Sequence, residues 1–217
     1  MTVTAALGRR RALMGLLGLA SLPLAVRGSI AAAADSAGPT ASVQAFAAAL
    51  LRVMKAGAST PFVARFAMLE PEISRAFDLG AILRVSVGSQ WAAMTPAQQT
   101  QLGAAYHRYT VANFVANFDS YSGETIEIAP GTRILANGDQ VVSTRIAAAG
   151  GMPVELSYVM RQGTGGWQAV DVLAQGSISR VATQRSDFRT VLASGGTAAL
   201  VSRLEGKVAS LSGGTLA

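Results

Sequence analysis

The spacing of the hydrophobic residues changes from helical to alternating near Glu124 and returns to helical near Phe188. Apolar residues that recur every three or four positions indicate amphipathic helices, whereas strict alternation over short runs indicates half-buried strands. Glycine-containing turn signals separate the alternating runs, so the strands are expected to be sequential and antiparallel. The chain is therefore predicted to have an α+β fold, in which helices pack on a curved, four-stranded antiparallel sheet.

Helices are expected before and after the four strands. The strongest start signal is Thr95-Pro96-Ala97-Gln98, which combines a capping box with proline at the first helical position. Asp78 is also expected to cap a helix. The predicted helices are 42–55, 60–70 with its end at Glu70-Pro71, 78–91, 95–118, and two pieces around 188–192 and 200–204. The predicted strands are 126–128, 142–146, 154–160 and 167–173, with turns at Asn137-Gly138, Gly150-Gly151 and Gly163 to Gly166.

The helix predicted at 95–118 has two apolar stripes. Leu102, Tyr106, Tyr109 and Asn113 form one stripe, and Val111, Phe114, Val115 and Phe118 form the other. A helix that is apolar on nearly all sides is either buried all round or faces something apolar that is not protein. It is therefore either a central core helix or one wall of a lipid or other hydrophobic pocket.

Composition and charge exclude several classes of protein. The chain has no cysteine and one histidine, His107, which excludes disulfide frameworks, cysteine zinc sites, thiol nucleophiles and multi-histidine metal sites. The net charge is +6, but four of the 18 basic residues lie in the first 34 positions, where there is no acidic residue. The rest of the chain has 14 basic and 12 acidic side chains. That near-neutral balance argues against nucleic-acid binding.

Residues 1–34 have the pattern of a cleaved export signal. A basic cluster at Arg9 to Arg11 precedes an apolar run at 12–25, and small residues end at Ala34. The apolar run is about 14 residues long, shorter than the roughly 20 needed to span a bilayer. We expect cleavage after Ala34, a linker at 35–41, a folded domain at 42–211 and a flexible tail at 212–217. Twin-arginine or general secretion would then deliver a soluble, monomeric protein to the periplasm.

The sequence contains no dinucleotide-binding, phosphate-loop, nucleophile-elbow or zinc-protease motif. His107 lies one residue off an apolar stripe and is expected to be solvated or partly packed. Asp171 is more informative, because it is predicted to share a strand face with Trp167, Ala169 and Leu173. It could be a general base with a raised pKa in a small cone-shaped α+β enzyme. The more common role of such an aspartate is that of a structural acceptor for backbone or tyrosine donors.

Several segments resemble the MlaC family of periplasmic phospholipid-binding proteins, also called the toluene-tolerance family. The segment from Gly166 to Ser179, with Trp167, Asp171 and Gly176, is similar to the tryptophan, aspartate, glycine and serine signature of that family. Other similar stretches follow the family's order and extend the resemblance from about Val43 to Lys207. They are Val87 to Trp91, Met94 to Gln99, Tyr121 to Glu124, Phe188 to Leu192, Gly195-Gly196 and Leu200 to Leu204.

The resemblance implies a carrier without catalytic residues or a cofactor, whose cargo is phospholipid. Its implied partners are an outer-membrane lipoprotein–porin complex and an inner-membrane ABC transporter complex with a substrate-binding hexamer, with a role in outer-membrane lipid asymmetry. The related hopanoid-biosynthesis protein HpnM implies a hopanoid cargo instead. Two departures leave the lipid species open: Gln184, where the family often has an aromatic residue, and the order of residues in Ser177 to Arg180.

Three classes of function therefore remain: a lipid shuttle, a small enzyme that uses Asp171, and a periplasmic interaction or chaperone module. A shuttle needs an apolar cavity enclosed by the helices and the sheet. Each residue proposed for its wall is also explained by ordinary core packing, because cores and lipid cavities use the same residue types. The residues predicted to line it are Ile82, Leu83, Tyr106, Tyr109, Phe114, Phe118, Leu156, Tyr158 and Val170.

Overall fold

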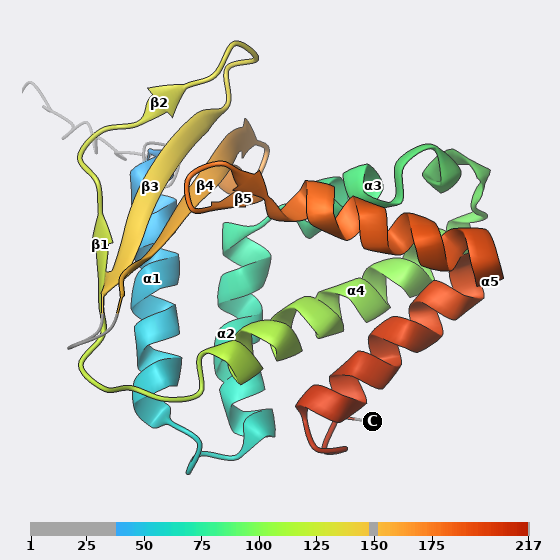
Figure 1. The fold of residues 1–217 in the computed structure, drawn as a ribbon, viewed down its shortest axis with the longest axis horizontal. Helices are drawn as coiled ribbons and strands as arrows, with labels where there is room; N and C mark the ends of the chain where they lie inside the picture. Colours follow the sequence, from blue (N-terminus) through green and yellow to red (C-terminus); the bar gives the residue numbers. More distant parts are fainter. Residues whose placement is uncertain (1–37, 148–151, 217) are drawn as a thin grey trace, which may run out of the picture. The chain divides into compact units, whose positions relative to one another are not determined.

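The computed structural model describes residues 38–147 and 152–216 (Figure 1). The predicted export signal, residues 35–37 of the predicted linker and the predicted turn at Gly150-Gly151 lie outside these residues. Among the described helices, none combines the length and apolarity required to cross a membrane.

The strands form one antiparallel sheet that is curved and unclosed. Its order is β1-β3-β4-β5-β6, and the short β2 pairs with β3. The four predicted strands correspond to β1, β3, β4 and β5. The two additional strands are two residues long, too short to show alternation. The strands are β1 Thr125–Ile128, β2 Arg133–Ile134, β3 Gln140–Ala147, β4 Val154–Gly163, β5 Gly166–Ala174 and β6 Ile178–Ser179.

The helices confirm the predicted α+β class. In chain order they are α1 Pro39–Ala56, α2 Phe62–Ala76, α3 Leu79–Val87, the 3₁₀ helix η2 Gly88–Ala93, α4 Pro96–Asn117 and α5 Arg180–Leu211. The capping box at Thr95 is present, with reciprocal bonds between Thr95 and Gln98. Asp78 caps α3 by accepting a hydrogen bond of 2.8 Å from the backbone N–H of Ala81.

The predicted end of the second helix at Glu70-Pro71 is wrong, because α2 continues through Pro71 to Ala76. Proline removes one intrahelical hydrogen bond. Leu69 and Ile73 lie one turn apart and are both fully buried, and the burial of this apolar face offsets that loss. Thr60 does not cap α2; its hydroxyl donates to the carbonyl of Ala56 at the end of α1.

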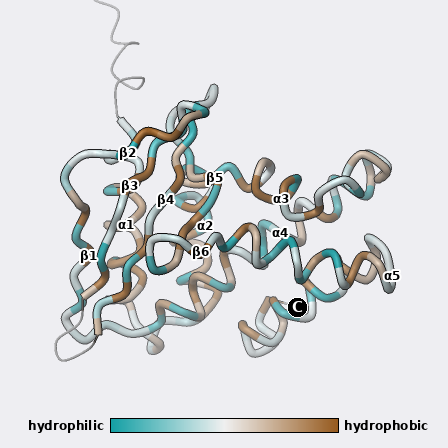
Figure 2. Tube along the Cα trace, turned by 45° about the horizontal axis from the view of Figure 1, so that its top comes forward, coloured by the Kyte–Doolittle hydropathy of each residue, from teal (hydrophilic) through white to brown (hydrophobic). Residues whose placement is uncertain are grey.

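The main core lies where α1 and α2 run side by side against the sheet (Figure 1). Phe46 and Leu50 of α1, Ile73 of α2 and Met160 of β4 are all nearly inaccessible to solvent. Figure 2 shows hydrophobic stretches both in the sheet and in the helices beyond it. Apolar residues therefore also lie outside this core. Those on α3, α4 and α5 surround a separate part of the interior, between these three helices.

The two predicted C-terminal helices are the two arms of α5, which are separated by a break at Gly196. We call residues 180–195 the first arm and residues 197–211 the second arm. Gly196 has φ 64° and ψ −162°, a conformation that only glycine adopts readily. A side chain at Gly195 would meet the Cβ of Ala199 at 2.5 Å. The glycine pair thus allows the sharp bend that places both arms beside α4 (Figure 1).

The last described residues, predicted as part of a flexible tail, form turns after α5. The hydroxyl of Ser212 accepts a hydrogen bond of 3.2 Å from the backbone N–H of Leu216. Leu216 packs against the core, and its carbonyl accepts a hydrogen bond from Arg108 of α4. Residues 212–216 are therefore tied to the helical part of the molecule.

Candidate functional site: an internal cavity

A cavity of about 730 Å³ lies between the sheet and the helices. Its walls come from α3, α4, both arms of α5, and strands β3, β4 and β5. The volume falls within the range of about 300–1,000 Å³ typical of small-molecule sites. The cavity exists because the bend in α5 places its second arm opposite the first, which leaves space along α4.

The sheet contributes an apolar wall. Leu156 and Tyr158 of β4 pair with Ala174 and Val172 of β5, and all four side chains line the cavity. These residues share one face of the sheet because side chains two positions apart point the same way. The alternation in β4 that predicted a strand therefore also supplies the apolar surface of the cavity.

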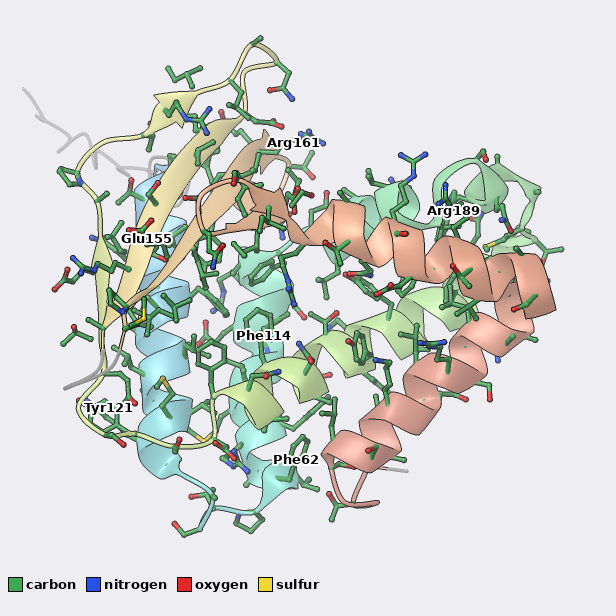
Figure 3. All side chains as sticks on the ribbon, viewed as in Figure 1. Phe62, Phe114, Tyr121, Glu155, Arg161 and Arg189 are labelled. Atoms are coloured by element: carbon green, nitrogen blue, oxygen red, sulfur yellow. The ribbon has the colours of Figure 1, made fainter. Side chains whose placement is uncertain are left out.

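Aromatic rings form the region where the cavity meets the main core. Phe114 of α4 stacks on Phe118, with ring centroids 6.1 Å apart, and meets Phe46 of α1 edge-on at 5.4 Å. Phe77, which lies between α2 and α3, contacts Phe114 at 5.6 Å. Figure 3 shows Phe114 in the interior between α4 and the sheet. Phe114 is thus part of both the core packing and the cavity wall.

The cavity wall also carries polar side chains. Asn113 and Asn117 of α4 line it, and three cationic side chains on α5 do so as well. The cations are Arg180 on the first arm and Arg203 and Lys207 on the second arm. The Nζ of Lys207 lies 5.6 Å from the centre of the Tyr109 ring, which is a cation–π contact. The cavity wall therefore combines the apolar surface of the sheet with three cationic side chains on α5.

Comparison with known proteins shows the family of the chain and a similar fold. The family model described as MlaC protein matches residues 44–206. This chain belongs to the MlaC family. Its fold is similar to the solved structure of a phospholipid-binding protein from Ralstonia solanacearum in complex with a phospholipid. The TM-score is 0.70 at 23% sequence identity, and the match covers 81% of this chain and 99% of the other.

Most of the predicted lining residues of the MlaC-family chain do surround the cavity. They are Ile82, Tyr106, Tyr109, Phe114, Phe118, Leu156 and Tyr158. Their contact with lipid stays a prediction. Leu83 does not line the cavity, because it is adjacent to Ile82 on α3 and points into the core, where it is 1% exposed.

Val170 does not line the cavity either. Val159 pairs with Asp171 and Met160 pairs with Ala169, so Val170 is the extra residue of a β-bulge. The bulge shifts the alternation of β5 by one position. It therefore puts Val172 and Ala174, not Val170, on the cavity side.

The same bulge changes the surroundings of Asp171 and separates it from the face that carries Trp167 and Ala169. Its carboxylate accepts hydrogen bonds from Ser179 Oγ and from the backbone N–H groups of Val172 at 2.7 Å and Val181 at 3.1 Å. Ser179 is the N-cap of α5. Asp171 thus ties the end of β5 to the first turn of α5, which favours the structural interpretation over the catalytic one.

His107 lies outside the cavity. Its Nε2 is 2.8 Å from the hydroxyl of Ser74, and its Nδ1 is 3.8 Å from the carboxylate of Glu70. Within residues 38–147 and 152–216, no group of three or more histidine, aspartate or glutamate side chains could hold a metal ion. The prediction of a partly packed surface histidine agrees with this position.

The charged and amide side chains of the wall were not predicted, because only aliphatic and aromatic residues were expected to line the cavity. Leu200, Arg203, Leu204 and Lys207 follow helical spacing and line the cavity together. This spacing is visible in the sequence. The spacing indicates a wall that is partly apolar and partly cationic only once the cavity beside the second arm is known.

Burial alters the acidity of the tyrosines in the wall. It raises the pKa of Tyr158 to about 12 from an ordinary value of 10.0. It also raises the pKa of Tyr106, and that of Tyr109, where the positive charge of Arg180 opposes the effect. These hydroxyls therefore stay protonated at neutral pH.

The raised pKa of Tyr158 predicts a loss of stability in alkali. Between about pH 10 and pH 12 the unfolded chain releases this proton before the folded chain does, so the free energy of unfolding falls as the pH rises. At about pH 11 the loss from this group is on the order of 1 kcal/mol. Urea unfolding at pH 9 and pH 11 should show a larger loss for the wild type than for Tyr158→Phe. Equal losses would contradict the prediction.

Proposed function

We propose that this MlaC-family chain is a periplasmic lipid carrier, which holds the acyl chains of a phospholipid in the cavity and exchanges them with membranes. The single observation that carries the proposal is the cavity of about 730 Å³, whose wall joins an apolar sheet surface to cationic side chains of α5. A lipid likewise joins apolar acyl chains to a polar headgroup. The phospholipid bound to the Ralstonia solanacearum protein, which has a similar fold, supports the same reading.

The energetics explain why such a carrier needs no chemistry. Two acyl chains of about 16 carbons each expose roughly 32 methylenes to water, at about 0.8 kcal/mol per methylene, or ~25 kcal/mol. By transition-state arithmetic, a barrier of that size allows an unaided exit about once in several days. A cavity that is about as apolar as the interior of a membrane removes this cost while the lipid crosses the aqueous space. The protein needs only to open at each membrane.

We place the protein in the periplasm because of the signal-like residues 1–34. By analogy with the family, we propose that it shuttles lipid between the outer-membrane lipoprotein–porin complex and the inner-membrane ABC transporter complex. A release assay tests this step. Protein loaded with labelled lipid should transfer it faster to vesicles that contain the transporter complex than to vesicles without it, and equal rates would contradict docking at that complex.

Native mass spectrometry of protein purified from the periplasm tests lipid binding directly. We expect a one-to-one adduct that extracts into organic solvent as phospholipid. A hopanoid in the extract would assign the carrier to the HpnM-like alternative. An empty protein that also takes up no lipid from vesicles would contradict the carrier proposal.

A further inference from the structure

The wall of the cavity contains a buried hydrogen-bond donor without an acceptor. Among the side chains of residues 38–147 and 152–216, Gln184 Nε2 is the buried nitrogen that lacks a partner. Gln184 lines the cavity from the first arm of α5, and its Oε1 accepts a hydrogen bond of 3.3 Å from the hydroxyl of Tyr106. Buried polar groups are nearly always paired, so an unpaired amide in a cavity wall indicates a ligand that supplies an oxygen acceptor.

The cations of α5 face the same cavity. Arg203 and Lys207 are four residues apart on the second arm, and like charges at this spacing repel each other. Within the described part of the chain, neither forms an ion pair with a carboxylate. Asp171 is engaged by Ser179 and Val181, and Asp187 is the other acid that lines the cavity. An anion held by the second arm would relieve the repulsion.

We propose, resting on the carrier function above, that the bent α5 forms a headgroup site selective for anionic, ester-linked phospholipids. Gln184 donates to an ester carbonyl at the root of the acyl chains, and Arg203 and Lys207 bind the negatively charged headgroup. The buried position of the Gln184 amide suits a neutral acceptor. The exposed positions of the two cations suit a charged group that remains partly in water. A zwitterionic headgroup carries an ammonium group that these cations repel.

The bend at Gly196 is what brings these groups together. Gln184 lies before the bend, and Arg203 and Lys207 lie after it, so a straight helix would separate them along its axis. The fold of α5 into two arms beside α4 makes them parts of one cavity (Figure 1). These three residues therefore share one cavity because of the tertiary structure and not because of their sequence spacing.

A loading competition tests the charge selectivity. Delipidated protein is mixed with vesicles of phosphatidylglycerol and phosphatidylcholine with identical acyl chains, and bound lipid is counted by native mass spectrometry. We expect the wild type to prefer phosphatidylglycerol by about 5–10-fold, and the double variant Arg203→Gln, Lys207→Gln to lose this preference while it still loads phosphatidylcholine. The matched control is Arg185→Gln, Arg189→Gln, an exposed pair of the same spacing on α5 that does not line the cavity (Arg189, Figure 3).

A second comparison tests the contact with Gln184. Gln184→Leu should lower loading of ester-linked phosphatidylglycerol by about 5–10-fold and change loading of the ether-linked analogue, which has no carbonyl, by a clearly smaller factor. An equal effect on both lipids would overturn the carbonyl contact. Circular dichroism and urea unfolding of each variant ensure that the comparison is made between folded proteins.

The results of these experiments distinguish a failure of the headgroup site from a failure of the carrier function. If the wild type loads neither lipid, the carrier function is wrong. If it loads phosphatidylglycerol and phosphatidylcholine equally, the function stands and the headgroup site is wrong. Free glycerol phosphate at millimolar concentration is expected not to displace bound lipid, and displacement would assign the cations to soluble phosphate esters instead.

Discussion

Replacing Phe114 by aspartate is expected to abolish lipid loading. The ring of Phe114 lies in the cavity wall among Phe118, Phe77 and Phe46. A carboxylate there would face an acyl chain without a partner, which costs about 3 kcal/mol or more and corresponds to a loss of affinity of about 100-fold or more. Uptake of phospholipid from vesicles, followed by native mass spectrometry, measures the effect.

The control for this prediction is Val85→Asp. Val85 is on α3, is 52% exposed and does not line the cavity, so the same new charge should leave loading unchanged. Because Phe114 also contacts the core, the variant Phe114→Leu provides a milder test, in which the fold is kept and loading is reduced but not lost. A folded Phe114→Asp protein that loads as well as the wild type would contradict the assignment of this wall.

Replacing Asp171 by alanine is expected to lower the free energy of unfolding by about 2–4 kcal/mol. The change leaves the hydroxyl of Ser179 and the backbone N–H of Val181 without their acceptor at the junction between β5 and α5. Since α5 supplies much of the cavity wall, loading should fall together with stability. Urea denaturation followed by circular dichroism measures the loss.

Asp119→Ala serves as the matched control for Asp171. Asp119 is exposed in the segment after α4, and its removal should change stability by less than about 0.5 kcal/mol. The enzyme interpretation makes a different prediction: Asp171→Asn would fold with wild-type stability and lose a catalytic turnover. That result would show that Asp171 acts as a general base and would contradict its structural role.

Features set by neighbouring residues were predictable from the sequence. The capping box at Thr95 and the cap at Asp78 involve donors and acceptors three positions apart, so tertiary packing is not needed to find them. The alternation in 154–160 likewise predicted β4, because side-chain direction in a strand follows position along the chain. The end of α2 was not predictable in this way, since burial of Ile73 outweighs the local effect of Pro71.

The candidate site shows the same division between local and tertiary effects. Tyr106 and Phe114 were placed in the wall because α4 carries apolar residues on several sides, and this property belongs to the sequence alone. Ile82 and Leu83 have equal hydrophobicity, and only the packing of α3 decides that the first lines the cavity and the second fills the core. The bulge at Val170 could not be predicted from the local sequence either, because it arises from the pairing of β5 with β4.

The α+β class, the order of the elements and the apolar character of the wall follow from the amino-acid sequence, because hydrophobic period and caps within one helical turn specify them. Packing of the elements, in contrast, sets which apolar residues face the cavity and brings Gln184, Arg203 and Lys207 into its wall. These residues come together through the bend at Gly196 and the packing of both arms on α4. Contacts between residues far apart in the chain depend on how the elements pack, which no local pattern specifies.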